Sequence, residues 1–412
     1  MNDNIILECG KSLSYICSCI YISNINKDTE KRDFFANYLL DNGIDKNQIA
    51  TNLLNINKGN LLTEDNIVDT YNQIKNSTKK ENAKTKVIEF KGEVLETKHF
   101  IELSNEKYLQ LKEEYYKKPD FNEVTKQFKN IAKGGTRNDK ITNYYVKDLM
   151  AKVKLYHSKW SIEDVWECKD LVARFYAQTF TNDKVFPRTN SDIKNIETAM
   201  RLGGKGVASK PTNFPIKTVD YILEKYNVNG NWYDFSCGWG ARLIGALKNN
   251  VNYFGTDPNF MLTDRLQKLA NDYKEVIDCK STVDIRTAGS EVYNADWENK
   301  IGLAFSSPPY FYLEDYKIGK QSYTEGTSYK DWKSNYLKPT IRNIYYYLIE
   351  EGYFLLNINN FENYDLVGDS IAIAEEIGFK LIKTESLKNI ERCKSTSGFN
   401  DNSEKILVFT KN

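Results

Sequence analysis

Apolar and polar positions follow a regular pattern in the second half of the chain, from about residue 206 onward. Short apolar runs of strand length alternate there with segments in which apolar residues recur every three or four positions, the spacing of one helix face. Strands are predicted at 232–235, 252–256, 283–287, 301–305, 353–358, 379–384 and 406–410, and helices at 216–226, 243–247, 261–273, 332–348 and 366–377. This alternation predicts an α/β fold with a parallel, doubly wound sheet. Because no helix is expected between the last two strands, the sheet should contain one antiparallel strand.

The first half of the chain has a less regular pattern. Residues 1–75 are expected to be mostly helical, and the polar stretch 76–86 has the composition of a linker. A strand or hairpin is expected at 87–103, followed by a charged helix, a basic stretch and a helix-rich segment at about 160–202. We therefore expect three parts: a helical N-terminal region at 1–86, a middle region at 87–205 and the α/β domain at 206–412.

Charge is balanced over the whole chain but uneven along it. The net charge of +1 gives no indication of a nucleic-acid partner, yet residues 117–159 carry eleven Lys or Arg against four acidic residues. Aromatic residues are interleaved with these basic residues, a mixture that neutralises phosphates and stacks on bases. The solvated face of a helix explains the same pattern equally well. The candidate nucleic-acid contacts are Lys126, Lys129, Lys133 and Arg137.

The composition excludes several kinds of chemistry. With 412 residues, of which 41% are hydrophobic, the chain can form two or three folded domains. Its seven cysteines form no Cys-x-x-Cys pair and it has only two histidines, so neither a zinc site nor a histidine base is expected. The apolar stretch at 13–22 is short and lacks a basic leader, which predicts neither a signal peptide nor a membrane span. We expect a reduced, metal-free, cytoplasmic protein.

The tetrapeptide Ser307-Pro308-Pro309-Tyr310 directly follows the predicted buried strand at 301–305. Proline fixes φ and has no N–H, so this segment offers carbonyl oxygens, a hydroxyl and an aromatic ring while its backbone donates almost nothing. A rigid, acceptor-rich strand end of this kind is suited to holding an amino group. A simple turn is the alternative, because Pro-Pro commonly ends regular structure.

A second group of candidate residues follows the first two predicted strands. The first strand leads into Asp234-Phe235-Ser236-Cys237-Gly238-Trp239-Gly240, and the second leads into Asp257-Pro258. A glycine turn followed by an acidic residue after the next strand is the layout of a site for a nucleoside-bearing cofactor. We expect the two glycines to let the backbone approach the ligand, Asp234 to accept a hydrogen bond from an ammonium, and Asp257 to bind ribose hydroxyls. A dinucleotide site is the competing interpretation, but the spacing is not Gly-x-Gly-x-x-Gly.

Taken in order, these elements resemble an S-adenosylmethionine-dependent amino-methyltransferase of the kind that modifies exocyclic amines of DNA bases. The resemblance covers residues 200–412, about half of the chain. It implies a class I methyltransferase, Rossmann-like fold, S-adenosylmethionine as cofactor, DNA as partner, and Ser307, Pro308, Pro309 and Tyr310 as the catalytic motif. The cofactor-binding residues that it implies are Asn213, Phe214, Pro215, Asp234, Phe235, Ser236, Gly238, Gly240, Asp257, Pro258, Ser290 and Glu291.

The implied reaction explains the residue types of the motif. A sulfonium makes its methyl group electrophilic, whereas the lone pair of an exocyclic amine is delocalised into the base. Hydrogen bonds to the Ser307 hydroxyl and the Pro308 carbonyl would hold the amine in place, and Tyr310 would stack on the extruded base. Within the resembling enzymes, serine in the first position of the motif slightly favours cytosine N4 over adenine N6 as the methylated group. Methylation at cytosine C5 is disfavoured because no cysteine follows a proline.

The sequence departs from the resembling family in target recognition. Residues 311–412 are needed for the sheet, so no sizeable recognition domain follows the motif. The middle region at 87–205 is the candidate DNA reader, with the loops at 312–330 and 392–405 as secondary contacts. Glu314 lies close enough in sequence to contact the base or to accept the released proton, and a surface carboxylate of the loop is an equally good interpretation. Two other interpretations stay open: an RNA or protein amino-methyltransferase, and a non-catalytic nucleic-acid-binding module.

Overall fold

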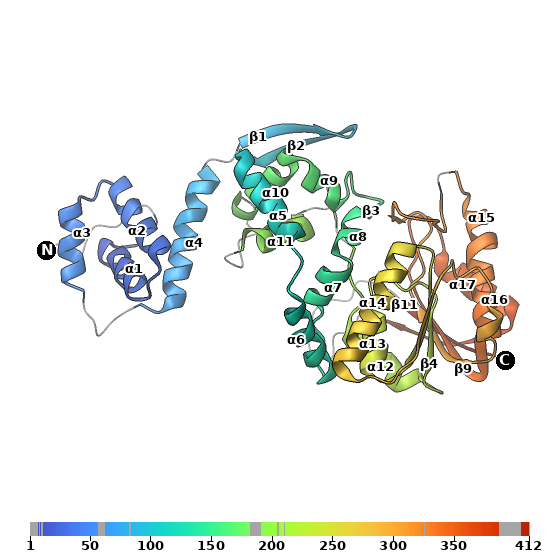
Figure 1. The fold of residues 1–412 in the computed structure, drawn as a ribbon. Helices are drawn as coiled ribbons and strands as arrows, with labels where there is room; N and C mark the ends of the chain where they lie inside the picture. The colour runs from blue at the N-terminus through green and yellow to red at the C-terminus, as the bar shows by residue number, and fades with distance from the viewer. Residues whose placement is uncertain are drawn as a thin grey trace. The chain divides into compact units, whose positions relative to one another are not determined.

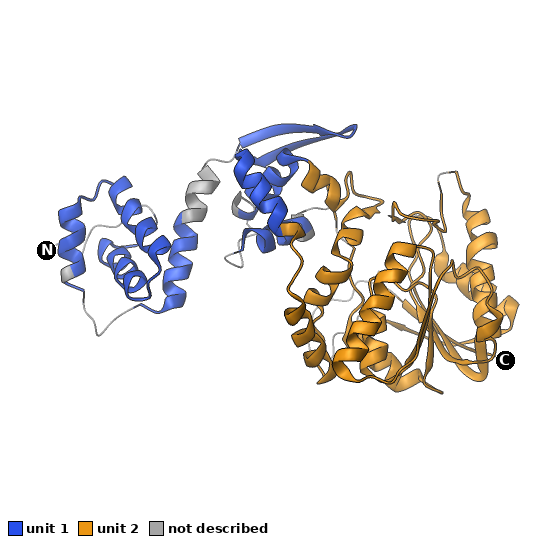
Figure 2. Ribbon diagram, in the orientation of Figure 1, with its two compact units in different colours: residues 1–114, 168–204 blue, residues 115–167, 205–412 orange. Residues whose placement is uncertain are grey.

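The chain folds into two compact units, shown in different colours in Figure 2. The first contains residues 1–114 and 168–204, and the second contains residues 115–167 and 205–412. The predicted middle region at 87–205 is therefore divided between the two units, and its role as a reader stays a prediction. The structure is a computed structural model that describes residues 7, 9, 11–56, 62–81, 84–181, 191–203, 206–209, 211–324, 326–386 and 405–411.

The first unit consists of helices and one β-hairpin (Figure 1). Its elements are α1 (Leu13–Ile25), α2 (Thr29–Asp41), α3 (Lys46–Leu54), α4 (Glu64–Glu81), β1 (Lys84–Phe90), β2 (Glu93–Phe100), α5 (Asn105–Tyr116), α10 (Lys169–Thr181) and α11 (Asp192–Gly203). The hairpin predicted at 87–103 is confirmed by the antiparallel pairing of β1 with β2. The linker predicted at 76–86 is wrong, because α4 continues to Glu81 and β1 begins at Lys84. This stretch has no glycine or proline to end the helix, and its Lys, Glu and Ala residues favour helix formation.

The second unit is a seven-stranded sheet with helices on both faces (Figure 1). Its helices are α6 (Phe121–Ala132), α7 (Asp139–Tyr145), α8 (Lys147–Lys152), α9 (Ile162–Glu167), α12 (Ile216–Tyr226), α13 (Ala241–Lys248), α14 (Phe260–Ile277), η1 (Ala295–Trp297), α15 (Tyr329–Trp332), η2 (Lys333–Leu337), α16 (Lys338–Tyr347) and α17 (Leu366–Ile377). Its strands are β3 (Lys154–Leu155), β4 (Asn231–Asp234), β5 (Asn252–Asp257), β6 (Val283–Thr287), β7 (Ile301–Ser306), β8 (Glu314–Asp315), β9 (Leu348–Ile358), β10 (Phe379–Ser386) and β11 (Lys405–Lys411).

The order of strands in the large sheet is β10-β11-β9-β7-β4-β5-β6. Neighbouring strands from β6 to β9 pair in parallel, whereas β11 pairs antiparallel with both β9 and β10. The predicted doubly wound α/β sheet with one antiparallel strand is therefore confirmed. The chain passes from β6 back across the sheet to β7, so the order reverses between β4 and β7. Ligands of such sheets bind outside the carboxyl ends of the strands at this switch point.

Alternate residues of the central strands face two different apolar cores. Trp232 of β4 and Leu303 of β7 pack with α6 to α8 and α12 to α14, whereas Tyr233 and Ala304 pack with α15 to α17. All six residues of β7 are buried, as expected for a strand covered on both faces. The two cores fix the carboxyl ends of β4, β5 and β7 at one edge of the sheet.

The helix predicted at 332–348 differs from the observed one in two ways. Leu348 begins β9 instead of ending a helix, and the helix opens into a π-helical turn, η2, before α16 begins. Pro339 lies at the start of α16 and has no N–H to donate to the preceding turn, which explains why the helix widens there. Single π-helical turns are frequent at functional sites.

Candidate functional site

A cavity of about 520 Å³ lies where the predicted site residues meet. Residues at the carboxyl ends of β4, β5 and β7 line it, together with the segments 212–215, 289–291 and 307–311. Every predicted catalytic and cofactor residue is part of this lining except Asp234 and Gly240. Segments separated by up to about a hundred residues are thus brought together around one space, as expected for a binding site.

The glycine turn after β4 needs both of its glycines, but for different reasons. Gly238 and Gly240 have φ values of +59° and +86°, which glycine adopts readily. Gly238 lines the cavity. A Cβ on Gly240 would lie 2.9 Å from Leu266 Cδ2 and 3.3 Å from Leu269 Cδ1. Gly240 therefore permits close packing of the turn against α14.

We expect Gly240→Ala to destabilise the second unit more than Gly230→Ala. Both positions have a positive φ, but a Cβ on Gly230 would meet no atom within 4 Å. The positive φ should cost each variant about 1–2 kcal/mol, and overpacking should cost Gly240→Ala roughly 1–3 kcal/mol more. Urea unfolding followed by tryptophan fluorescence measures the difference, because all six tryptophans lie in the second unit. If both variants lost the same free energy of unfolding, the role of Gly240 in packing against α14 would be contradicted.

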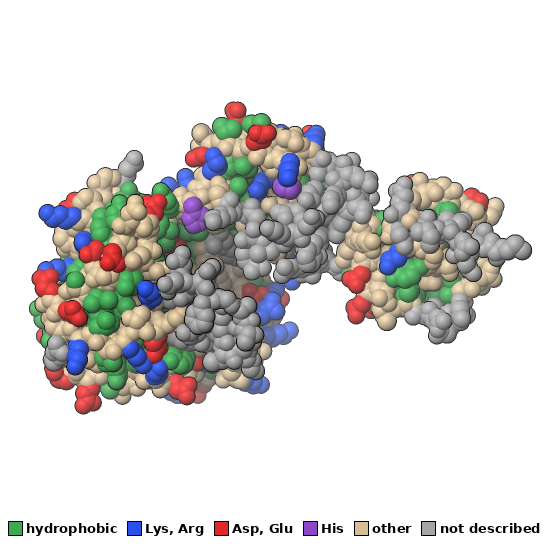
Figure 3. All heavy atoms as spheres, turned by 180° about the vertical axis from the view of Figure 1, so that it is seen from behind, with side chains coloured by type: hydrophobic (Ala, Val, Ile, Leu, Met, Phe, Trp, Pro, Cys, Tyr) green, Lys and Arg blue, Asp and Glu red, His purple; other side chains and the backbone are tan. Residues whose placement is uncertain are grey.

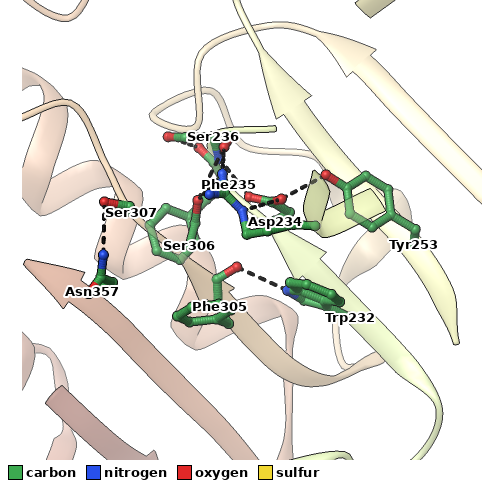
Figure 4. A network of polar contacts seen from close by, with 10 residues as sticks. Trp232, Asp234, Phe235, Ser236, Tyr253, Phe305, Ser306, Ser307 and Asn357 are labelled. Atoms are coloured by element: carbon green, nitrogen blue, oxygen red, sulfur yellow. Dashed lines mark hydrogen bonds and ion pairs between the residues drawn. The ribbon is translucent and has the colours of Figure 1, made fainter. Parts of the chain in front are cut away.

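Arg242 connects the glycine turn to β7, the strand that precedes Ser-Pro-Pro-Tyr. Figure 4 shows the polar contacts around Asp234, Ser236 and Ser306. Its Nε donates to Asp234 Oδ2 over 2.8 Å, and its Nη2 donates to the carbonyl of Ser236 and to Ser306 Oγ, the latter over 3.2 Å. Asp234 is completely buried and also accepts a hydrogen bond of 2.7 Å from the Tyr253 hydroxyl. Asp234 therefore stabilises the conformation of the turn and does not line the cavity. The sequence suggested instead that Asp234 accepts a hydrogen bond from an ammonium of the ligand.

Asp257 places a carboxylate in the wall of the cavity at the end of β5. Its Oδ1 accepts a hydrogen bond of 3.0 Å from the backbone N–H of Asn259. Burial, with the nearby Asp234 carboxylate adding to it, raises the pKa of Asp257 to about 7. This carboxyl is therefore poised between its two protonation states near neutral pH, and a ligand that donates hydrogen bonds would favour the ionised form.

Asn213 and Phe214 line the cavity just before α12. The Asn213 amide donates from Nδ2 to Thr142 Oγ1 over 2.6 Å, so a residue of α7 orients this side chain. Among the described residues, the buried Asn213 Oδ1 has no hydrogen-bond partner. Phe214 packs edge-on against Phe305 with 5.4 Å between ring centroids. The site therefore contains a fixed amide oxygen that can accept a hydrogen bond from a ligand.

Ser290 and Glu291 line another part of the cavity. The Ser290 carbonyl accepts a hydrogen bond of 2.9 Å from Asn343 Nδ2, and Glu291 forms a 3.2 Å ion pair with Lys320. The π-helical turn η2 brings Tyr336 into the same wall. Burial raises the pKa of Tyr336 well above its usual value, so this side chain is a neutral hydroxyl.

Two neighbouring side chains contact the hydroxyl of Ser307 in the Ser-Pro-Pro-Tyr segment. Asn357 Nδ2, at the end of β9, donates to Ser307 Oγ over 3.3 Å, and Ser307 Oγ donates to the Tyr310 hydroxyl over 3.5 Å. A serine oxygen has two lone pairs. With its hydrogen directed to Tyr310 and one lone pair used by Asn357, the other lone pair can accept a hydrogen bond from an amino group.

The aromatic residues of the motif are packed into the protein. Tyr310 is only 9% exposed, and its hydroxyl donates to the Asn357 carbonyl over 3.3 Å. Phe311 has a φ of +55°, which is a strained value for a bulky residue. Its ring lies among aromatic neighbours, including Tyr323 at 5.1 Å and Trp332 at 5.9 Å between centroids. This packing holds the loop in a conformation that it would not adopt alone.

Glu314 lines the cavity and accepts a hydrogen bond from the Tyr316 hydroxyl. It belongs to β8, which pairs antiparallel with β3, so that Leu155 lies opposite Glu314. This two-residue sheet was not predicted, and it fixes part of the basic stretch beside the loop that follows Ser-Pro-Pro-Tyr. Glu314 is therefore a lining residue and not only a surface carboxylate.

The predicted nucleic-acid contacts lie on or near α6, away from the cavity. Lys126, Lys129 and Lys133 are exposed, whereas Arg137 forms two hydrogen bonds of 2.6 and 2.9 Å with Asp139. On the buried side of α6, Phe128 packs against Tyr273 at 5.1 Å between ring centroids. Tyr273 lies about 17 Å along α14 from Leu262, which lines the cavity, at about 1.5 Å per residue.

The charged surface is mixed on the face shown in Figure 3, with positive and negative side chains interspersed. Some of the basic residues at 117–159 have acidic partners: Lys140 pairs with Glu123, and Lys152 pairs with Glu163. Lys147 is buried, with its ammonium 2.6 Å from the Tyr115 carbonyl. The loop predicted at 392–405 lies outside the described residues except for Lys405.

Sequence reasoning missed four residues that shape this site: Thr142, Arg242, Tyr336 and Asn357. A signal existed for Asn357, because it is a polar residue inside the apolar run 353–358. Arg242 also stands in the segment after the glycine turn, but its pairing with Asp234 depends on the turn's geometry. Thr142 and Tyr336 carry no signal in the pattern, because their roles depend on contacts between distant segments.

No family model matches this chain. No curated protein matches it either. Solved structures with a similar fold include a TehB-like S-adenosylmethionine-dependent methyltransferase from Corynebacterium glutamicum, with 16% identity, a TM-score of 0.33 and coverage of 47% of this chain and 88% of that one. Magnesium protoporphyrin IX methyltransferase from Synechocystis PCC 6803 has 14% identity, a TM-score of 0.33 and coverages of 48% and 79%. The CcbJ methyltransferase from Streptomyces caelestis has 9% identity, a TM-score of 0.36 and coverages of 48% and 95%.

Two further properties concern only the described part of the chain. None of its helices combines the length and the apolar character needed to cross a membrane. Within the same residues, no group of three or more His, Cys, Asp or Glu side chains is arranged to hold a metal ion.

Proposed function

We propose that this chain transfers the methyl group of S-adenosylmethionine to an exocyclic amino group of a DNA base, with cytosine N4 favoured over adenine N6. The observation that carries the proposal is the convergence of a glycine turn, an acidic strand end and the Ser-Pro-Pro-Tyr motif on one cavity. The first two elements suit a nucleoside with an amino-acid side chain, and the third suits an amine. The preference for cytosine rests on Ser307 alone.

The cofactor residues can be assigned by the hydrogen bonds that they offer. Asp257 would accept the two ribose hydroxyls, and Ser290 and Glu291 would lie near the adenine. The Asn213 amide oxygen would accept a hydrogen bond from the ammonium, a role first expected for Asp234. Phe235, Ser236, Gly238 and Pro258 would contact the ligand along the cavity wall.

The chain's own contribution to the reaction is to position the amine. When bound, S-adenosylmethionine would supply an electrophilic methyl group on a sulfonium. Ser307 Oγ and the Pro308 carbonyl would accept the two hydrogens of the amine, which directs its lone pair toward the methyl carbon. As the new C–N bond forms, the bond between the methyl carbon and the sulfonium would break and leave a neutral thioether. The nitrogen loses one proton, and Glu314 is its proposed acceptor. Positioned contacts of this type contribute about 10²–10³ in rate each.

Methyl transfer with labelled S-adenosylmethionine to duplex DNA, RNA and protein tests the function. Analysis of the nucleosides by mass spectrometry should find N4-methylcytosine in DNA from expressing cells. N6-methyladenine would keep the proposed function and reverse the base preference. Label found only in RNA or protein would overturn the DNA assignment, and absence of cofactor binding in calorimetry would leave a non-catalytic module as the better description.

The affinity for S-adenosylmethionine should depend on pH through Asp257. Its pKa of about 7 in the free protein means that most molecules carry a protonated carboxyl below pH 7. Ribose hydroxyls donate to the ionised form, so binding should be about tenfold weaker at pH 6 than at pH 8. Isothermal titration calorimetry at pH 6, 7 and 8 measures this change.

Asp257→Asn is the matched control for this prediction. The amide keeps the shape of the side chain but does not titrate. The affinity of this variant for S-adenosylmethionine should be lower than that of the wild type at pH 8 and nearly constant from pH 6 to 8. A pH dependence that persists unchanged in Asp257→Asn would assign the titration to another group.

A further inference from the structure

Three aromatic side chains from distant parts of the second unit meet beside the catalytic loop. Tyr156 follows β3, Tyr312 follows the catalytic motif and Phe361 follows β9. Their ring centroids are 5.1 Å apart for Tyr156 and Tyr312, 5.5 Å for Tyr156 and Phe361, and 5.0 Å for Tyr312 and Phe361. We call these three residues the aromatic surface.

Backbone and side-chain contacts fix the aromatic surface in place. The N–H of Tyr156 donates to the Leu313 carbonyl over 2.8 Å, which extends the pairing of β3 with β8. The Tyr312 hydroxyl donates to Glu362, and the hydrogen bonds that Glu362 accepts from Tyr312 and Tyr156 lower its pKa. The rings are therefore held in position before any ligand arrives, which lowers the entropic cost of stacking.

The aromatic surface adjoins the proposed site for the amine without being part of the cavity wall. Leu313, which accepts the hydrogen bond from Tyr156, lines the cavity, whereas the three rings do not. Phe361 lies four residues after Asn357, the residue that donates to Ser307. A group bound on the rings would therefore lie next to the group bound at Ser307.

The ring of Tyr156 is open to solvent. This tyrosine is 50% exposed although it contacts two other rings. A planar ligand that stacks on a ring needs such an open face. Nucleobases stack on such rings with little dependence on sequence, because every base has a π-face.

We propose that the aromatic surface, with Tyr156 as its open face, stacks on a nucleobase adjacent to the base whose amine is methylated. This inference rests on the proposed function. It assigns substrate binding to a residue outside the large sheet, and it separates two tasks: Ser307 holds the reacting amine, and Tyr156 holds the neighbouring nucleotide. The lysines of α6 would then contribute only contacts to phosphates, which position the DNA without reading it.

The test compares Tyr156→Ala with Tyr346→Ala in the full chain. Tyr346 is a matched control, because it is 46% exposed and lies on α16. The substrate is an oligonucleotide centred on the methylated base that the nucleoside analysis and mapping identify. We expect Tyr156→Ala to raise KM for this DNA about tenfold with little change in kcat, and Tyr346→Ala to match the wild type.

Two further measurements separate stacking from a structural role. Tyr156→Phe keeps the ring but loses the hydroxyl near Glu362, so it should retain the wild-type KM. An abasic nucleotide next to the target base should raise the KM of the wild type about tenfold. With this substrate, the wild type and Tyr156→Ala should have the same KM. If Tyr156→Ala methylates the intact oligonucleotide as well as Tyr346→Ala does, the aromatic surface does not bind substrate, although the proposed function stands. If the wild type methylates no DNA, the proposed function fails and this inference with it.

Discussion

Ser307→Ala is expected to lower the rate of methyl transfer by about 10²–10³, without changing the affinity for S-adenosylmethionine. The variant removes one of the two oxygens proposed to accept a hydrogen bond from the amine, while Asn357, Tyr310 and the Pro308 carbonyl stay in place. Because Ser307 would contact the amine and not the cofactor, the loss should appear in kcat. Single-turnover methylation of DNA measures the rate, and calorimetry measures the affinity.

Ser334→Ala is a suitable control for that substitution. Ser334 is exposed in η2, and its hydroxyl donates to the Asp331 carbonyl over 3.2 Å. This control should keep full activity. A Ser307→Ala variant with more than about a third of the wild-type rate would show that the hydroxyl does not hold the amine, since the loss of one positioned contact costs far more.

Arg242→Met is expected to destabilise the second unit by about 3–5 kcal/mol, because it leaves the buried Asp234 carboxylate without its cationic partner. The guanidinium is 7% exposed and Asp234 is 0% exposed, so water cannot replace the lost ion pair. The substitution also frees the Ser236 carbonyl and Ser306 Oγ from the same side chain. Urea unfolding followed by tryptophan fluorescence reports this unit alone, as described for Gly240.

A double variant shows whether Arg242→Met loses stability because the Asp234 carboxylate is left without a cationic partner. Asp234→Asn combined with Arg242→Met removes both charges and should recover part of the stability lost in Arg242→Met. Arg242→Lys keeps the positive charge and should lose less than Arg242→Met. A loss below about 1 kcal/mol for Arg242→Met would contradict this account, because that value is typical of exposed ion pairs.

The strands of the second unit were predictable because their signals are local. β5 and β6 begin at residues 252 and 283, where the apolar pattern begins, and each is bounded by polar residues. The carboxyl ends of these strands meet at one edge of the sheet in any doubly wound fold. Because the strands were predicted correctly, most residues of the cavity wall, including Asp257 and Ser307, could be predicted from the strand ends.

The contacts that refine the site were not predictable, because they depend on distant segments or on exact turn geometry. Asp234 was expected to face a ligand, but the turn at Gly238 brings Arg242 back onto it. The pairing of Leu155 with Glu314 joins residues far apart in the sequence through only two positions, which leaves no periodic signal. The end of helix α4, residues 76–81, was expected to be part of a linker, because polar residues can form a helix that packing elsewhere supports.

The position of β11 in the sheet has a consequence for synthesis on the ribosome. β11 lies between β9 and β10, yet it is translated after both. Until residues 405–411 emerge, β10 has no partner strand in the sheet, and β9, which pairs with β7 on its other side, presents one open edge of N–H and C=O groups along an apolar run. Unpaired strand edges are templates for aggregation. Each nascent chain therefore passes through a vulnerable interval, in which chaperones that shield β9 would decide how much protein reaches the native state.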